Sequence, residues 1–308
     1  MRAFVYFKYE DCLMKINRKV FLKSLGFGAV GTLTGSSLAK TADSSGLTEP
    51  YATGPIKKRK LGKNGLMASV LCLGAGSRFT NEQFLPGDER GEYMRYAMSQ
   101  GINYIDTAIN YGQSEIILGE LFNSDDWSKL IISSKTPSRT YDDVMRDFEI
   151  SAKNLKLDYL DVYLLHNNAL SNSVDDNREI FSALLELREK GHVGNIGFSS
   201  HSAVSLPVAV NLVKEYDLDH LVLNVAEDRV DYRPAMPEIL ATGCTVAAIK
   251  VTRSFEGKGP VESARLSYKD VLDRSFASAI ISHSNAGIGD RGWKVVLDEN
   301  LKTARMFA

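Results

Sequence analysis

The chain contains 308 residues, of which 44% are hydrophobic and 24% are charged, and both fractions are ordinary for a soluble globular protein. This composition excludes wholesale disorder and a collagen-like chain, and no apolar run reaches the roughly 18 residues of a membrane-spanning helix. The 37 basic and 38 acidic residues leave a net charge of −1, which provides no electrostatic argument for nucleic-acid binding. Three scattered cysteines without a CxxC pair argue against a disulfide scaffold and against a metal site.

Residues 1–39 differ in composition from the rest of the chain, and their pattern is that of an export signal. The basic stretch 15–23 (KINRKVFLK) precedes a weakly apolar, glycine-rich stretch, and the small residues 37–39 would serve as a cleavage site. NRKVFLK resembles the twin-arginine export motif, with Arg18 present and Lys19 in place of the second arginine. The pattern therefore predicts a twin-arginine-like leader, a contact with the export machinery, and a periplasmic or otherwise exported protein. The alternative is a cytoplasmic protein with a disordered or helical N-terminal arm.

Two boundaries follow from this leader. Residues 1–13 fit no signal and Met14 would make a natural start, so we expect an over-extended reading frame. Residues 40–55 are small and polar, which predicts a linker. The remaining residues, 56–308, follow one regular pattern and predict a single domain.

From residue 56 onward, short apolar strands alternate with amphipathic helices. A hairpin with its turn at Asn64-Gly65 comes first. The predicted strands that follow are 69–76, 103–108, 130–135, 161–166, 195–200, 220–225, 245–251 and 277–284. The predicted helices are 93–100, 114–122, 141–155, 178–190, 204–216, a short helix before Gly243, 267–276 and 293–307.

Eight strands alternating with helices over about 250 residues predict a (β/α)8 barrel, an α/β fold also called a TIM barrel. Several strands are apolar throughout, which is typical of a parallel sheet buried on both faces. The alternative, an open doubly wound sheet, usually carries a GxGxxG turn after its first strand, and LGAGSRF at 73–79 does not match that spacing. We therefore expect a closed barrel preceded by a short hairpin.

Four polar residues stand where a barrel places its catalytic groups, at the C-terminal ends of strands. Asp106 ends the second strand, and Tyr111 follows in the same loop. Lys135 and His166 end the third and fourth strands. Each residue alone has an ordinary structural explanation, such as a helix cap, loop packing or a hydrogen-bonded filler. Four together at consecutive strand ends favour a catalytic site.

Several segments between Ile56 and about Val251 resemble the aldo-keto reductase family. They are RKLGKNGLMASVLCLGAG, GINYIDTAINYGQSEIILGELF, IISSK, LKLDYLDVYLLH and REKGHVGNIGFSSH. The resemblance implies a (β/α)8 barrel and an NAD(P)H-dependent oxidoreductase that reduces an aldehyde, ketone or sugar-like carbonyl. It also places the family's four catalytic positions on the strand-end residues, which are Asp106, Tyr111, Lys135 and His166.

The chemistry of carbonyl reduction explains why these residue types would occur together. Hydride transfer leaves negative charge growing on the carbonyl oxygen, which needs a proton donor within reach. A free tyrosine has a pKa of about 10, and a neighbouring ammonium lowers that pKa. We therefore expect Lys135 to tune Tyr111 as the general acid. Asp106 would pair with Lys135, and His166 would hydrogen-bond the substrate oxygen and assist proton transfer.

The resemblance also implies where a nicotinamide cofactor binds, with NADP(H) favoured over NAD(H). Ser199, Ser200 and Asn224, at the ends of the fifth and sixth strands, would hold the nicotinamide. The loops after the seventh and eighth strands would hold the phosphates, and the last helix would hold the adenine. The residues expected there are Lys250, Arg253, Ser282, Asn285, Glu299 and Asn300. The basic residue that the family places three positions before Glu299 is replaced by Val296.

A few residues are expected near the substrate. Phe79, Trp127 and Asn167 would line the pocket, although Trp127 could equally pack between a helix and a strand. His201 fits a surface position or one that supports the site.

Two other functions remain open from the sequence. The protein could be a cofactor-binding, redox-sensing or regulatory subunit with little turnover, or a degenerate member that no longer binds cofactor. If the chain is exported, a tightly held cofactor would have to travel with the folded protein. Cys72 and Cys244 fall on the first and seventh strands, which are not neighbours in an eight-stranded barrel, so we expect no disulfide between them.

Overall fold

The computed structural model describes residues 54–76, 78–201, 204–224, 232–249, 251, 260–273, 277–283 and 292–307. The predicted leader and nearly all of the predicted linker lie outside these residues. So do three predicted cofactor contacts, Lys250, Arg253 and Asn285, and the side chain of a fourth, Ser282. In the part of the chain that is described, none of the helices is both long enough and apolar enough to span a membrane.

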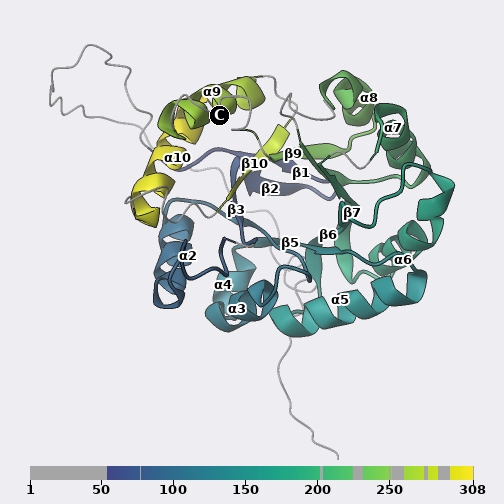
Figure 1. Cartoon of the computed structure of the whole chain (residues 1–308), viewed down its shortest axis with the longest axis horizontal. Coiled ribbons are helices and arrows are strands. Elements are labelled where there is room, and N and C mark those ends of the chain that lie inside the picture. Colours follow the sequence, from purple (N-terminus) through teal and green to yellow (C-terminus); the bar gives the residue numbers. More distant parts are fainter. Residues whose placement is uncertain are drawn as a thin grey trace, which may run out of the picture.

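Eight parallel strands close into a barrel in the order β10-β3-β4-β5-β6-β7-β8-β9, as the sequence predicted (Figure 1). Their bounds are β3 Leu71–Gly74, β4 Tyr104–Asp106, β5 Ile131–Thr136, β6 Leu160–Leu165, β7 Val193–Ser200, β8 His220–Asn224, β9 Thr245–Ile249 and β10 Ala277–His283. Pairing of β10 with β3 completes the ring, with Ile280 opposite Leu71. The barrel is therefore closed, and the open doubly wound alternative is wrong.

Helices cover the outside of the barrel (Figure 1). They are α2 Arg90–Ser99, α3 Ser114–Leu121, α4 Ser124–Ser128, α5 Tyr141–Leu155, α6 Arg178–Glu189, α7 Leu206–Glu215, α8 Met236–Ala241, α9 Pro260–Asp273 and α10 Trp293–Phe307. Short 3-10 turns occur at η1 Gly87–Glu89, η2 Asp175–Asn177 and η3 Arg233–Ala235. Helix α9 begins seven residues earlier than the predicted 267–276, so the expectation of a short helix there is wrong. Pro260 suits its first position because proline lacks only an N–H that a helix start leaves unbonded.

Helix α5 shows how local sequence sets an element. Thr140 caps its start, since the hydroxyl accepts a hydrogen bond from the Asp143 backbone N–H. Val144, Phe148 and Leu155 recur on one face and are buried against the barrel, as their spacing predicted. The following Lys156 adopts a left-handed conformation at φ 57°, which ends the helix.

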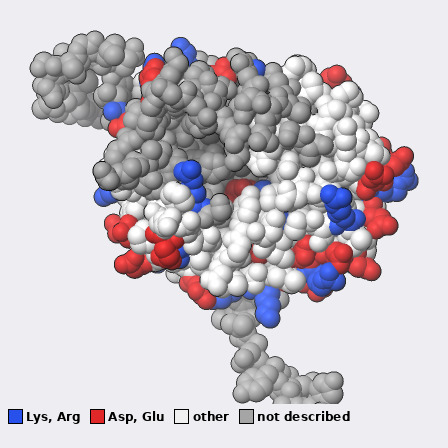
Figure 2. All heavy atoms as spheres, viewed as in Figure 1, with Lys and Arg blue, Asp and Glu red and all other residues white. Residues whose placement is uncertain are grey.

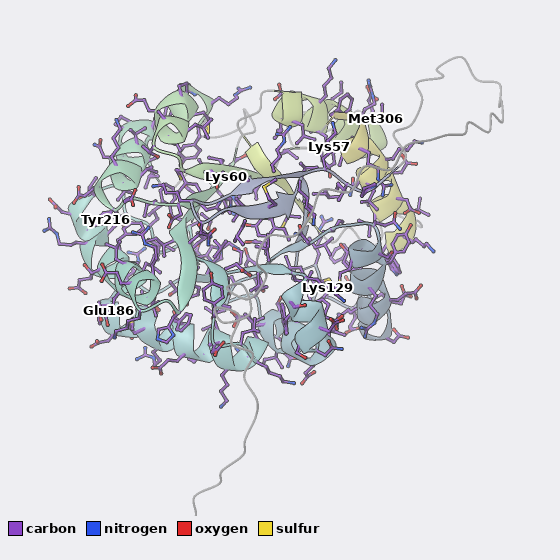
Figure 3. All side chains as sticks on the ribbon, turned by 180° about the vertical axis from the view of Figure 1, so that it is seen from behind. Lys57, Lys60, Lys129, Glu186, Tyr216 and Met306 are labelled. Atoms are coloured by element: carbon purple, nitrogen blue, oxygen red, sulfur yellow. The ribbon has the colours of Figure 1, made fainter. Side chains whose placement is uncertain are left out.

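The predicted hairpin is present as β1 (Lys58–Leu61) and β2 (Leu66–Ser69), which pair antiparallel. It closes the N-terminal end of the barrel and lies across it in the rear view, where Lys60 is labelled (Figure 3). The Gly62 N–H donates to Thr245 Oγ1 at 2.7 Å, at the first residue of β9. A Cβ added at Gly62 would lie only 1.8 Å from Asn195 Oδ1 of β7, so the turn approaches the barrel too closely for any side chain there.

Alternation along the strands divides their residues between two hydrophobic cores. The inner core fills the barrel and takes residues from six strands and the hairpin, namely Leu61, Ala68, Cys72, Tyr104, Ile131, Val162, Leu164, Val222, Ala247 and Ile249. The intervening strand positions, such as Leu73, Ile132, Phe198 and Leu223, pack outward against the helices. This periodicity predicts which polar residues at the strand ends face the inside of the barrel.

The two described cysteines are buried free thiols. Cys72 lies on β3 and Cys244 directly precedes β9, and β10 separates these two strands. Burial raises the pKa of the Cys244 thiol to about 12 and raises that of Cys72 as well. Both sulfurs are therefore protonated and unreactive at neutral pH.

Candidate active site

The four predicted catalytic residues converge at the C-terminal end of the barrel. Asp106 is the last residue of β4, Lys135 lies near the end of β5, and His166 directly follows β6. Each occupies an inward position, because Tyr104, Ile131 and Leu164, which lie two or four positions earlier on the same strands, belong to the inner core. Tyr111 reaches the same place from the loop after β4, through a turn in which its N–H donates to Ala108 O. Figure 2 shows a hollow near the middle of this face, with acidic and basic atoms at its bottom.

Lys135 and Asp106 form a buried ion pair. Lys135 Nζ donates to Asp106 Oδ2 at 2.6 Å and to the Thr107 carbonyl oxygen at 2.7 Å. The side chains are only 2% and 7% exposed. Burial by itself would lower the pKa of Lys135, but the neighbouring Asp106 and Tyr111 more than offset that effect and leave the pKa raised. The ammonium therefore stays charged at neutral pH, as the sequence analysis expected.

Tyr111 lies between this ion pair and His166. Its hydroxyl is 3.4 Å from His166 Nε2, and the two rings meet edge to face with centroids 5.4 Å apart. Lys135 Nζ lies 5.4 Å from the centre of the tyrosine ring. Burial raises the pKa of Tyr111, and although Lys135 lowers it, the net shift is upward. Lys135 thus lowers the pKa of Tyr111 as expected, but the net shift is upward, because removal from water disfavours the phenolate more than one ammonium stabilises it.

His166 is held from its other side by a residue that the sequence analysis did not identify. Its Nδ1 is 2.9 Å from Asn110 Oδ1. Burial, Lys135 and His201 together lower the pKa of His166 to about 3, so the imidazole is neutral at pH 7. Asn110 immediately precedes Tyr111 in the chain, but its contact with His166 joins residues 56 positions apart. Only the closed barrel brings them together.

Three other predicted residues lie on the same inner rim. Ser199 and Asn224 take inward positions at the ends of β7 and β8, and Asn167 follows β6. Ser199 Oγ accepts from the Asn167 backbone N–H at 3.3 Å, and Asn167 Oδ1 accepts from the His201 N–H at 2.7 Å. Asn224 Nδ2 donates to the His201 carbonyl at 3.4 Å. Hydroxyl and amide groups side by side are a donor and acceptor set that fits the carboxamide of a nicotinamide.

The structure does not bring the remaining described candidates to this rim. Ser200 takes the outward position on β7, where its hydroxyl lies 2.8 Å from that of Tyr232. Glu299 and Asn300 lie on α10, where Asn300 is buried. Val296, at the position where the family carries a basic residue, is buried on the same helix and packs as an ordinary apolar side chain. The roles predicted for Ser200, Glu299 and Asn300 stay predictions.

Two expected pocket residues prove to be packing residues. Trp127 lies on α4, four residues before Ile131, which begins β5, and therefore near the opposite end of that strand from the site. It is 1% exposed and packs edge to face on Phe122. The pocket prediction for Trp127 is wrong and the packing alternative is confirmed. Phe79, in the loop after β3, is fully buried in the hydrophobic core between the strands and the surrounding helices. Helix α4 itself went unpredicted, although the Asn123–Asp126 capping box marks its start.

Among the described residues, there is no group of three or more His, Cys, Asp or Glu side chains that could hold a metal ion. The site is built instead from an ion pair, a phenol, a neutral imidazole and a rim of amides and hydroxyls. Such a set can bind a polar carbonyl compound, deliver a proton to it and stabilise the resulting phenolate.

Curated proteins similar to this chain include oxidoreductases. A Bacillus subtilis protein named uncharacterized oxidoreductase YqkF is 29% identical over 177 residues, or 52% of this chain and 52% of its own length. L-glyceraldehyde 3-phosphate reductase from Escherichia coli is 28% identical over 198 residues, or 57% of this chain and 54% of its own. The chain thus spans about half the length of the curated relatives it matches.

Solved structures share the fold over most of the chain. A Pseudomonas aeruginosa protein assigned to the aldo-keto reductases has a TM-score of 0.69 at 24% identity, covering 81% of this chain and 95% of that one. A Bombyx mori aldo-keto reductase in complex with NADP has a TM-score of 0.58 at 18% identity, covering 81% and 94%. At these identities the likeness shows the fold alone.

The family model supplies the assignment that these structures do not. The model is described as Aldo/keto reductase family. It matches residues 70–240, which run from β3 into α8 and contain Asp106, Tyr111, Lys135 and His166. Because this match spans more than half of the chain, the protein belongs to the aldo/keto reductase family.

Proposed function

We propose that the protein is an NAD(P)H-dependent oxidoreductase that reduces an aldehyde, ketone or sugar-like carbonyl, with Tyr111 as the general acid. The observation that carries the proposal is the assembly of Tyr111 beside His166 and the buried Asp106–Lys135 pair, in a hollow at the strand ends. The raised pKa of Tyr111 keeps the phenol protonated before reaction. The charged Lys135 then stabilises the phenolate that remains after the proton has left.

The rim residues support a nicotinamide cofactor in the same hollow. Ser199, Asn167 and Asn224 would hold its carboxamide, and the bound cofactor would supply the hydride. NADP(H) is favoured, since the similar Bombyx mori structure is a complex with NADP. A buried site also strengthens the effect of Lys135 on negative charge, because water does not screen it.

The test is a titration of the purified full chain with NADPH and NADH, followed by quenching of tryptophan and tyrosine fluorescence, and then by a carbonyl substrate screen. We expect binding of at least one nucleotide and turnover that Tyr111→Phe lowers strongly. General acid catalysis contributes roughly 10²–10⁴-fold, so a loss of at least about 100-fold in kcat is expected. The control is Tyr141→Phe, because Tyr141 lies on α5 and its hydroxyl donates to Glu186 on the neighbouring helix α6.

Each outcome of this test separates the candidate functions. Binding without turnover would favour the redox-sensing or regulatory subunit, and the absence of binding would favour a degenerate member. Turnover that is nearly unchanged in Tyr111→Phe would refute the assignment of the general acid.

We also propose that residues 1–39 form a twin-arginine-like leader and that the protein acts outside the cytoplasm with its cofactor tightly bound. The support is the sequence of the segment alone. Expression of the full reading frame, cell fractionation and mass spectrometry of the N-terminus would test this. Export with cleavage after residue 39 is expected, together with nucleotide that co-purifies with the protein. A cytoplasmic protein with an intact N-terminus would refute it.

A further inference from the structure

Ser114, the first residue of α3, contacts the loop that carries Tyr111 and one of the two groups that hold Lys135. We propose that Ser114 is a positioning residue that holds the Thr107 carbonyl against the Lys135 ammonium and so keeps this ammonium in place beside Tyr111. The effect on turnover rests on the proposed function, whereas the effect on Lys135 is measurable without it.

Two hydrogen bonds hold the Lys135 ammonium in the described structure. Its Nζ donates to Asp106 Oδ2 at 2.6 Å and to the Thr107 backbone carbonyl at 2.7 Å. The same nitrogen lies 5.4 Å from the centre of the Tyr111 ring. An ammonium has three N–H donors, so these two bonds set the direction of the third. The position of the Thr107 carbonyl therefore affects how Lys135 faces Tyr111.

The side chain of Thr107 is tied to α3 by a chain of two hydroxyl groups. Thr107 Oγ1 lies 2.8 Å from Ser114 Oγ, which donates to the Ala75 carbonyl at 2.5 Å. A serine hydroxyl has a single hydrogen, and here that hydrogen goes to Ala75, so the Thr107 hydroxyl must donate to Ser114. Both hydroxyl-bearing residues are fully buried, and water cannot easily replace either bond. Ser114 thus links the segments that follow β3 and β4.

The start of α3 makes two further contacts next to catalytic groups. The Ser114 backbone N–H donates to the Tyr111 carbonyl at 3.2 Å. The next residue, Glu115, accepts a hydrogen bond from Ser134 Oγ at 2.6 Å, and Ser134 directly precedes Lys135 on β5. These contacts fix α3 relative to β5, so the Ser114 hydroxyl is a stationary anchor for Thr107.

A buried serine near the other end of the barrel provides the matched control. Ser69 Oγ donates to the Leu71 carbonyl at 2.7 Å and accepts from the Asn103 N–H at 3.1 Å. It is fully buried, as Ser114 is, and it links the segments that precede β3 and β4. Ser69→Ala and Ser114→Ala should therefore lower the urea midpoint of unfolding by similar amounts. Only Ser114→Ala removes a link to the active site.

Nitrogen NMR of the lysine side chains measures the effect on Lys135 in the full chain without substrate. A buried, hydrogen-bonded ammonium exchanges its hydrogens slowly with water, and its signal is assigned by its loss in Lys135→Arg. We expect Ser114→Ala to shift or broaden this signal and Ser69→Ala to leave it unchanged. Thr107→Val keeps the side-chain shape but lacks the hydroxyl, so it should reproduce the effect of Ser114→Ala.

Steady-state kinetics then test the consequence for the reaction. Misplacement of a catalytic group can cost about 100-fold in rate, and we expect Ser114→Ala to lower kcat about tenfold. The KM for the carbonyl substrate should change little, because Ser114 is fully buried. Thr107→Val should cause a similar loss. The double variant should lose no more than either single variant, because both substitutions remove the same hydrogen bond.

The two measurements separate this proposal from the proposed function. An unchanged Lys135 signal in Ser114→Ala would overturn the positioning role while leaving the proposed function intact, and so would a kcat equal to that of Ser69→Ala. A changed Lys135 signal in a protein without turnover would have the reverse meaning, because the proposed function alone would then fail.

Discussion

The buried Asp106–Lys135 pair gives a sharp prediction about stability. Replacing Lys135 by methionine keeps most of the volume but removes the ammonium. Asp106 would then be a carboxylate without a cation, 7% exposed, and its Oδ1 already has no hydrogen-bond partner in the described structure. Removing one member of a buried ion pair typically costs about 3–5 kcal/mol of unfolding free energy, and we expect a loss in that range.

An exposed ion pair on the same molecule provides the matched control. Lys129 Nζ also lies 2.6 Å from a carboxylate oxygen, that of Asp125, but these side chains are 60% and 75% exposed. Lys129→Met should therefore leave the unfolding free energy almost unchanged. The two pairs have the same separation, so the expected difference comes from burial and from the second hydrogen bond of Lys135 to the Thr107 carbonyl.

Urea denaturation at pH 7 measures both variants, and a double variant tests the cause. Asp106→Leu with Lys135→Met removes both charges and should recover most of the loss, because no uncompensated charge stays buried. Equal small effects of Lys135→Met and Lys129→Met would refute this reasoning. So would a double variant no more stable than Lys135→Met, which would place the cost in packing rather than in the charge of Asp106.

Three further predictions concern other parts of the barrel. Burial lowers the pKa of His220 to about 3, so on acidification the unfolded chain takes up a proton at a higher pH than the folded protein does. The unfolding free energy should therefore fall by up to about 1.4 kcal/mol per pH unit as the pH drops from about 6 to 4. Urea titrations at several pH values should show a shallower decline in His220→Gln than in the wild type. Gly62→Ala should destabilise by more than about 1 kcal/mol because its Cβ meets Asn195, whereas Gly65→Ala, with open space and φ +84°, should cost less in the same assay. Trp127→Phe should lower the melting temperature without changing nucleotide affinity in a binding titration, since Trp127 is a packing residue.

Much of the architecture was predictable because it depends on short-range patterns. Strands with two buried faces are apolar throughout, and helices such as α5 carry apolar residues at helical spacing. Their alternation predicted the barrel, and the rule that strand ends carry the site predicted Asp106, Lys135 and His166. The inward position of Ser199 and the outward position of Ser200 also follow from strand periodicity, although that signal was not used.

The sequence by itself determined the alternation of strands and helices, the hairpin turn and the polar residues at the strand ends, because each depends on residues close together in the chain. Only the tertiary structure decided the ionisation and orientation of those residues. The pKa of Tyr111 rises because the closed barrel removes water from around it, an effect that outweighs Lys135. The contact of Asn110 with His166 and the position of Trp127 away from the site likewise depend on which segments the closed barrel brings together. Local sequence patterns do not specify such contacts between segments that are distant in the chain.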